Sequence, residues 1–231
     1  IMKQYRNIFL VLITALVVNH SAYAQPEGRP FKHMVAVAPL ALIDFTPAFQ
    51  MAYEYRFAKD FSIHAEAGLI NNWLTDWHFK EFRNQLGYRI RIEPRWYFGG
   101  SETRGGGAYL APEVFFSRHT FDRTRTFGFN CDPSGRDGRL ECDYYRTTTY
   151  SGFRQDAGFH FKIGGQVALD LKERFWLDIY TGLGFRHRTI ETEGQPVGGS
   201  VIRKDFPFGQ DERSDFLLSA SAGFKFAYRI R

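Results

Sequence analysis

Apolar and polar residues alternate with a period of two along most of the chain. In Leu86–Phe98, charged residues stand at alternate positions from Arg89 to Arg95, and Tyr, Ile, Pro and Trp lie between them. The same alternation recurs in Phe49–Phe57, Phe61–Leu69, Ala157–Leu171, Phe175–Phe185 and Phe216–Arg229. Because successive side chains of a strand point to opposite faces, this pattern predicts β-strands with one apolar and one polar face.

Two further segments alternate less regularly. Ala108–Phe116 contains Pro112, which removes a ladder hydrogen bond, and Met34–Phe45 is apolar on both faces. With these two segments, the chain is predicted to form eight strands. No helical periodicity of useful length is found, so the pattern predicts an all-β fold.

The predicted connections alternate between short and long. The short ones are Ala58–Asp60, Gly99–Gly107 and Lys172–Arg174, and the long ones are Asn71–Asn84, Arg118–Phe153 and His187–Ser214. Asp44–Pro47 is a short exception among the long connections. Short turns at one end and long loops at the other predict an eight-stranded antiparallel up-and-down transmembrane β-barrel over residues 34–231.

Glycine indicates which face of the strands lies inside. Gly165 is on the apolar face, whereas the charged face carries Gly68, Gly87, Gly158, Gly164, Gly182, Gly184 and Gly223. Inside a narrow barrel, missing side chains leave room for long arginines, and the aromatic-rich apolar face is too bulky to fit there. We therefore expect charges inside and aromatic residues outside, against lipid. A soluble barrel with an apolar interior is the alternative.

The interior face carries acidic and basic residues in nearly equal numbers. The acids are Glu54, Glu66, Glu93, Glu113, Asp156, Asp170 and Asp178, and the bases are Arg56, Arg89, Arg91, Arg95, Lys162, Arg186, Lys225 and Arg229. Because unpaired buried charges are costly, this balance predicts an ion-pair network that fills the lumen, with His64 and His160 as further members. A wide channel is not expected, and a narrow gated path through the network is an alternative.

The N-terminal residues have the pattern of an exported protein. Lys3 and Arg6 precede an apolar run, Ile8–Val18, and the small residues of Ser21–Ala24 follow. This pattern predicts a signal peptide over residues 1–24, cleaved after Ala24, and a short lead over residues 25–33. The apolar run is too short to span a bilayer and no run of 18 apolar residues follows it, which excludes a helical membrane protein.

Composition adds two constraints. The sequence has 30 basic and 25 acidic residues, and removing Lys3 and Arg6 leaves a net charge of +3, too small to indicate a nucleic-acid partner. Cys131 and Cys142 are the only cysteines, and an exported location permits them to form a disulfide.

Two aromatic-rich segments are candidates for binding. Arg118–Phe153 combines arginine and aromatic residues that suit lipopolysaccharide phosphates or a surface protein ligand, and a plain solvated loop is the alternative. Trp73, Trp77, Phe79 and Phe82 are expected to form an aromatic belt at the membrane interface, with a binding patch as the alternative.

In this organisation the chain resembles the small outer-membrane β-barrel family that includes the OmpA transmembrane domain and OmpX. The segments LGYRIRIEPRWYF and SAGFKFAYRIR are similar to barrel proteins of Bacteroidetes-type outer membranes. The resemblance implies a location in the outer membrane of a Gram-negative-type cell, surrounded by its lipid and lipopolysaccharide, and insertion by the barrel assembly machinery. We expect a monomer.

No group of residues indicates a catalytic or metal site. Ser117 and His119 share one strand face and His187 stands at another rim, but no orienting group or oxyanion site is recognisable. Metal-ligand spacings and phosphate-binding glycine loops are not found either. We therefore expect a non-enzymatic, cofactor-free outer-membrane barrel with a structural or adhesive role. A lipid A-modifying enzyme is the alternative.

Overall fold

The computed structural model describes residues 32–42, 48–71, 82–98, 106–132, 141–194, 196, 200–201 and 213–230. The strands are β1 (His33–Val37), β2 (Ala48–Arg56), β3 (Phe61–Asn71), β4 (Phe82–Phe98), β5 (Gly107–Asp132), β6 (Glu141–Ala168), β7 (Phe175–Glu193), β8 (Ser200–Val201) and β9 (Arg213–Ile230). A short 3-10 helix, η1 (Pro39–Leu42), follows β1. Within these ranges, no helix has the length and apolarity needed to cross a membrane.

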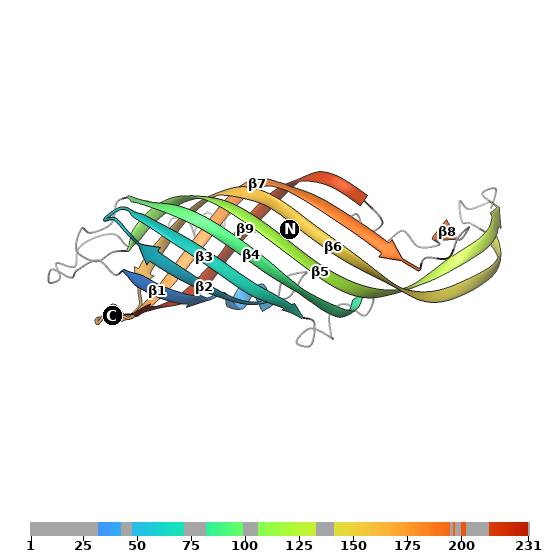
Figure 1. Cartoon of the computed structure of the whole chain (residues 1–231), viewed down its shortest axis with the longest axis horizontal. Helices are drawn as coiled ribbons and strands as arrows, with labels where there is room; N and C mark the ends of the chain where they lie inside the picture. Colours follow the sequence, from blue (N-terminus) through green and yellow to red (C-terminus); the bar gives the residue numbers. More distant parts are fainter. Residues whose placement is uncertain are drawn as a thin grey trace, which may run out of the picture.

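Antiparallel pairing joins eight of the strands into a closed ring (Figure 1). Strands β1 to β7 pair in chain order, β9 pairs with both β7 and β1, and the β4–β5 pairing completes the ring. The two-residue β8 lies outside the ring and pairs with β5 at Phe127 and Gly128. The predicted eight-stranded antiparallel up-and-down barrel is therefore confirmed.

Side chains alternate between buried and exposed along the ring strands, strictly so in β2 and β3. In β3, Ser62, His64 and Glu66 are buried, whereas Phe61 and Ile63 are about half exposed. The polar face thus lies inside the barrel and the apolar face outside, which is the arrangement that the glycines predict.

Glycines on the inner face do make room for large side chains. A Cβ atom at Gly164 would overlap the ring of Tyr109, and one at Gly223 would lie 2.8 Å from the hydroxyl oxygen of Tyr180. Both tyrosines are buried in the lumen. The inner glycines are therefore part of how a narrow barrel holds bulky polar residues.

The segment predicted as a long loop, Arg118–Phe153, is mostly strand, so this prediction was wrong. β5 and β6 stay paired from Ser117 opposite Asp156 to Asp132 opposite Glu141, forming a hairpin that projects beyond the ring (Figure 1). Its outer face carries Thr120, Thr124 and Thr126 in place of large apolar residues. Exposed and buried residues still alternate there, but the exposed ones are polar. A search for strands with an apolar outer face therefore misses this alternation. β7 likewise continues to Glu193, into the predicted loop His187–Ser214.

The predicted strand Met34–Phe45 is shorter in the structure. β1 ends at Val37 and η1 begins at Pro39, because proline lacks the N–H that a ladder requires but fits the first turn of a helix. Other predictions lie outside the described residues: the signal peptide with its cleavage after Ala24, the lead up to residue 31, and Trp73, Trp77 and Phe79.

Candidate functional site: a charged barrel interior

Lys225 lies at the centre of the charged interior. Its Nζ donates to a carboxylate oxygen of Glu66 at 2.7 Å and to Oε1 of Glu93 at 3.3 Å. It also lies 2.9 Å from Nε2 of His64, and because an ammonium has only donors, this nitrogen accepts. Lys225 is fully buried, so its charge depends on these partners for compensation.

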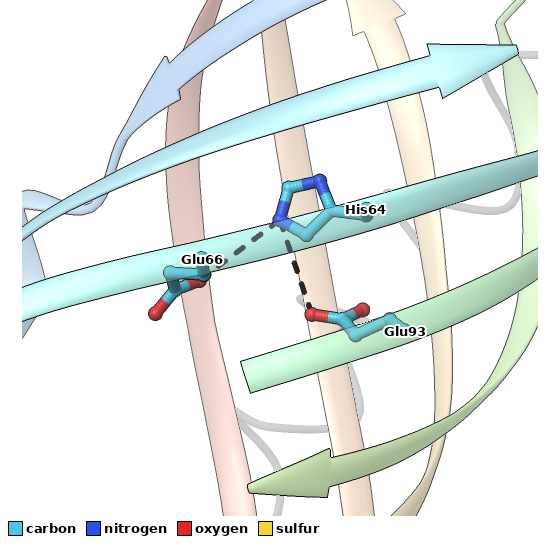
Figure 2. A group of neighbouring side chains, drawn as sticks. All are labelled: His64, Glu66 and Glu93. Atoms are coloured by element: carbon cyan, nitrogen blue, oxygen red, sulfur yellow. Dashed lines mark ion pairs between the residues drawn. The ribbon is translucent and has the colours of Figure 1, made fainter. Parts of the chain in front are cut away.

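The same residues form the one metal-like arrangement found among the described residues. His64, Glu66 and Glu93 converge from β3 and β4, with ligand atoms that all lie within 4.8 Å of one another (Figure 2). Sequence spacing does not reveal the group, because the register of two strands brings it together. The ammonium of Lys225 contacts all three side chains and supplies the positive charge that a metal ion would otherwise provide.

Arg95 forms the second centre of the network. Its guanidinium donates to Glu54 at 3.0 Å, to Glu93 at 3.2 Å and to Asp178 at 2.8 Å. It therefore connects β2 and β4 to β7, on the other side of the ring. The hydroxyl of Tyr109 also donates to Asp178, at 2.8 Å. The carboxylates of Glu54, Glu93 and Asp178 therefore each accept a hydrogen bond from a charged donor.

Lys162 continues the network toward β5. Its Nζ donates to Glu93 at 3.1 Å and contacts Glu113 closely, and Glu113 also lies 2.8 Å from Nδ1 of His160. The ring of Tyr180 lies 4.4 Å from Nζ of Lys162 and 5.0 Å from Nζ of Lys225, measured to the ring centroid. An aromatic ring between two buried ammonium groups stabilises both through cation–π attraction.

The structure brings most of the predicted interior residues together. The connected set comprises Glu54, Glu66, Arg91, Glu93, Arg95, Glu113, Lys162, Asp178 and Lys225, and the predicted histidines His64 and His160 join it. Arg56 stacks over the ring of Tyr97 at 3.9 Å. Arg89 and Arg186 lie nearer the hairpin end, where Asp156 pairs with Arg154 and Arg188.

Two predicted members lie elsewhere. β6 ends at Ala168, so Asp170 is in the turn that follows and not in the lumen. The backbone N–H groups of Phe175 and Arg174 donate to its carboxylate, and these hydrogen bonds hold the pKa of Asp170 below its ordinary value. Arg229 contacts Glu173 of the same turn at 3.5 Å, at the rim and away from the central network.

No family model, curated protein or solved structure matches this chain. A proposal for its function therefore rests on the geometry of the chain itself.

The candidate catalytic residues are not brought together. Ser117 and His119 are buried inside the barrel on β5, whereas His187 lies on the outer side of β7 and hydrogen-bonds Ser214 at 3.0 Å. Gln166 and Tyr180 lie inside, on the polar face to which the alternation assigns them, and the amide of Gln166 donates to Glu54 at 2.9 Å. The alternation was not extended to Tyr97 and Tyr109, which are also buried in the lumen. Tyr97 and Tyr109 stand in register with the charged face, and this is the signal that could have placed them inside.

Proposed function

We propose that the protein is a non-enzymatic integral barrel of the outer membrane whose projecting hairpin binds ligands at the cell surface. The observation that carries this proposal is an outer face without charge. In the described parts of the ring strands, no outward-facing residue between the two ends of the barrel is Asp, Glu, Lys or Arg. Large apolar members of this face are Phe49, Met51, Ile63, Leu69, Tyr88, Ile90, Ile92, Trp96, Val114, Phe161, Ile163, Leu183, Phe185 and Phe226, all at least 40% exposed.

This exposed apolar face encircles the ring, and soluble proteins rarely expose apolar patches beyond a few hundred Å². From Leu86 to Phe98, at about 3.3 Å per residue and a tilt of about 40°, the face has a height of about 30 Å, enough for the hydrocarbon core of a bilayer. Polar outward residues such as Arg118 and Thr120 begin where this height ends. A lipid environment accounts for both the lack of charge and the limits of the face.

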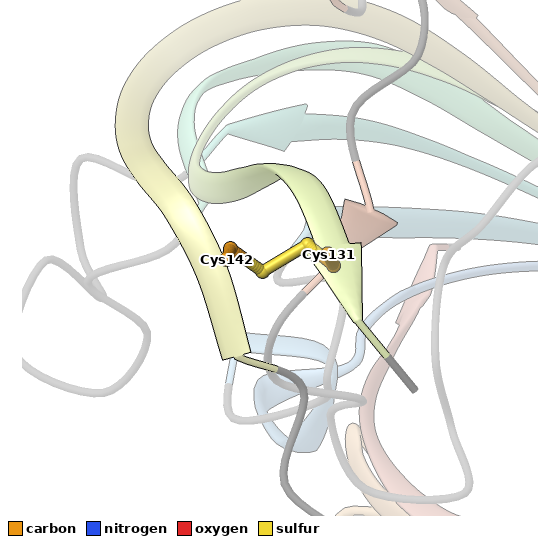
Figure 3. The surroundings of a disulfide bond; sticks show 2 residues. All are labelled: Cys131 and Cys142. Atoms are coloured by element: carbon orange, nitrogen blue, oxygen red, sulfur yellow. A yellow bond between two sulfur atoms is a disulfide. The ribbon is translucent and has the colours of Figure 1, made fainter. Parts of the chain in front are cut away.

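The hairpin supports the surface-binding part of the proposal. From Arg118 to Asp132, β5 continues past the apolar face for about 45 Å of strand length, at about 3.3 Å per residue. Cys131 and Cys142 are opposite each other and form a disulfide near its end, as the sequence permits (Figure 3). Beside it, the rings of Phe129 and Tyr144 stack at 4.9 Å, and Tyr144 remains 53% exposed. A rigid element that presents aromatic residues suits protein or glycan contact, because little freedom is lost on binding.

The base of the hairpin is fixed by a surface carboxylate. Asp122 accepts hydrogen bonds from Asn84 and Ser151, each at 2.7 Å, and so joins β4, β5 and β6. These two hydrogen bonds hold the pKa of Asp122 below its ordinary value. The hairpin is therefore attached to the ring by side-chain contacts in addition to its ladder.

The proposal is tested by the electrophoretic mobility of the protein from purified outer membranes, loaded unheated or boiled in detergent. We expect the unheated protein to migrate differently, because a closed barrel with an internal ion-pair network resists detergent at room temperature. Recovery in the soluble periplasmic fraction, with no heat-dependent shift, would contradict the membrane assignment and favour a soluble barrel.

The disulfide is expected to stabilise the end of the hairpin and not the barrel. Closing the loop between Cys131 and Cys142, separated by 11 residues, contributes up to about 3 kcal/mol against the unfolded chain. We therefore expect Cys131→Ser/Cys142→Ser to increase trypsin cleavage within residues 118–153 of protein in intact membranes. The heat-dependent gel shift should be unchanged. Loss of that shift in the double variant would show that the hairpin stabilises the ring.

A further inference from the structure

The two edges of β9 are paired over very different lengths, although the ring is closed. β1 pairs only with residues Phe226–Ile230 of β9, whereas β7 pairs with β9 from Arg213 to Tyr228. On the edge of β9 that faces β1, the residues that precede Phe226 pair with no strand in the part of the chain that the structure describes. η1 packs between β2 and β9 beside this edge. Among the described residues, a short helix and not a ladder therefore lies beside this edge of β9.

A cavity of about 350 Å³ lies at this place. Its lining includes Ala220 and Ala222 from the outer face of β9 and Ser221 from the inner face of the same strand. Residues from both faces of one strand line the same cavity, so the cavity passes around the open edge of β9. Ala38 and Ala41, next to and within η1, line the opposite side. The larger Phe224, also on the outer side of β9, completes the lining on the β9 side.

The inner part of the cavity is polar and cationic. This part is lined by Gln50, Arg89, Arg91 and Tyr180, next to the ion-pair network of the lumen. Nearby, Glu66 lies 3.6 Å from Arg91 and 2.7 Å from Lys225, so Arg91 shares this carboxylate with a second cation. Nε of Arg91 is buried and has no hydrogen-bond partner among the described residues. The inner cavity is therefore suited to an anionic group.

The outer part lies at the depth of the apolar face. Ala220 and Ala222 follow Leu218 and precede Phe226 on the outer side of β9, and both of these large residues are exposed. Lipid tails cannot hydrogen-bond the backbone groups of an open strand edge, so at this depth the edge needs polar partners. The headgroup of a lipid would bring such partners together with its negative charge.

We propose that this opening admits the anionic headgroup of a membrane lipid sideways into the barrel wall, while its acyl chains stay outside against β9. The inference rests on the proposed membrane location. The cavity is at the lower end of the range for small-molecule sites, large enough for a phosphate-bearing headgroup but not for a whole lipid. Arg89 and Arg91 would contact the phosphate.

The test uses full-length protein folded in vesicles of phosphatidylcholine and phosphatidylglycerol in equal amounts. One of the two lipids at a time carries a photoreactive diazirine at the start of an acyl chain. After irradiation, mass spectrometry locates the labelled peptides. We expect phosphatidylglycerol to label residues 34–42 and 216–228 about tenfold more than phosphatidylcholine, because both lipids carry a phosphate but only phosphatidylcholine carries a cation, which Arg89 and Arg91 repel.

Two variants address the opening and its charge separately. Ala222→Trp fills the opening and Arg91→Gln removes a cation, and each should abolish the preference for phosphatidylglycerol. Val114→Trp, on the outer face of β5, and Arg118→Gln, beyond that face, are matched controls and should keep it. If Arg91→Gln does not fold, the labelling of Ala222→Trp by the two lipids is by itself the test of the site.

Several outcomes would overturn the inference. Equal labelling by the two lipids, or labelling unchanged in Ala222→Trp, would exclude a lipid site. Suppression of labelling by inorganic phosphate would show that the cavity takes soluble anions instead. The heat-dependent gel shift is measured first: a chain that shows none disproves the proposed function and this inference with it. A chain that inserts but labels equally disproves the inference alone.

Discussion

Replacing Lys225 by methionine is expected to lower the free energy of unfolding of the barrel by about 3–5 kcal/mol. Methionine fills a similar volume but removes the ammonium that lies 2.7 Å from Glu66 and 3.3 Å from Glu93. Both carboxylates are buried and would keep only their other donors. The loss is large because charges buried without compensation cost more than the pair contributes.

The measurement is urea-induced unfolding of protein folded in phospholipid vesicles, followed by the gel shift. Lys172→Met is the matched control, because Lys172 is exposed in the turn between β6 and β7 and its replacement should change stability by less than about 0.5 kcal/mol. Equal midpoints for the two variants would show that the interior carboxylates do not depend on Lys225.

Replacing Ile92 by arginine is expected to destabilise the membrane-inserted barrel by about 2–4 kcal/mol. Ile92 is 45% exposed on the outer face, midway along the apolar stretch of β4, and a guanidinium there would face hydrocarbon. Thr124→Arg is the control: Thr124 also points outward, but on the hairpin beyond the apolar face, where it hydrogen-bonds Thr149 at 2.8 Å. Its replacement should have little effect.

This pair of variants separates the two possible environments of the outer face. In vesicles, Ile92→Arg should shift the urea midpoint of folding strongly and Thr124→Arg should not. If Ile92→Arg is neutral, the face that carries Ile92 is in contact with water, and the proposed membrane location is wrong.

The fold was predictable because each ring strand repeats one physical pattern. The alternation in Leu86–Phe98 fixes which residues of β4 face inward, and shifting the register by one would expose Arg89, Arg91 and Arg95 together. The hairpin was not predictable in the same way. Its strands lie beyond the proposed membrane, so Thr120, Thr124 and Thr126 replace the large apolar residues on which the prediction depended.

The interior site was predictable in composition but not in its contacts. Nearly equal numbers of acids and bases predicted a nearly neutral network, yet which charges pair depends on how far strands shift around the ring. Arg95 contacts Asp178, which is 83 residues away, and no local spacing indicates that pair. Asp170 was misassigned because the period of two was extended past Ala168, where the chain turns.

The cross-lumen ion pairs have a consequence for assembly. Lys225 of β9 meets Glu66 of β3, and Arg95 of β4 meets Asp178 of β7, and in each pair the two strands are not neighbours in the ring. Neither pair can form in a half-built sheet, which would carry its charges into the bilayer without partners. Ring closure and charge neutralisation are therefore coupled, and we expect insertion to be an all-or-none event in which an incomplete barrel is not released into the membrane.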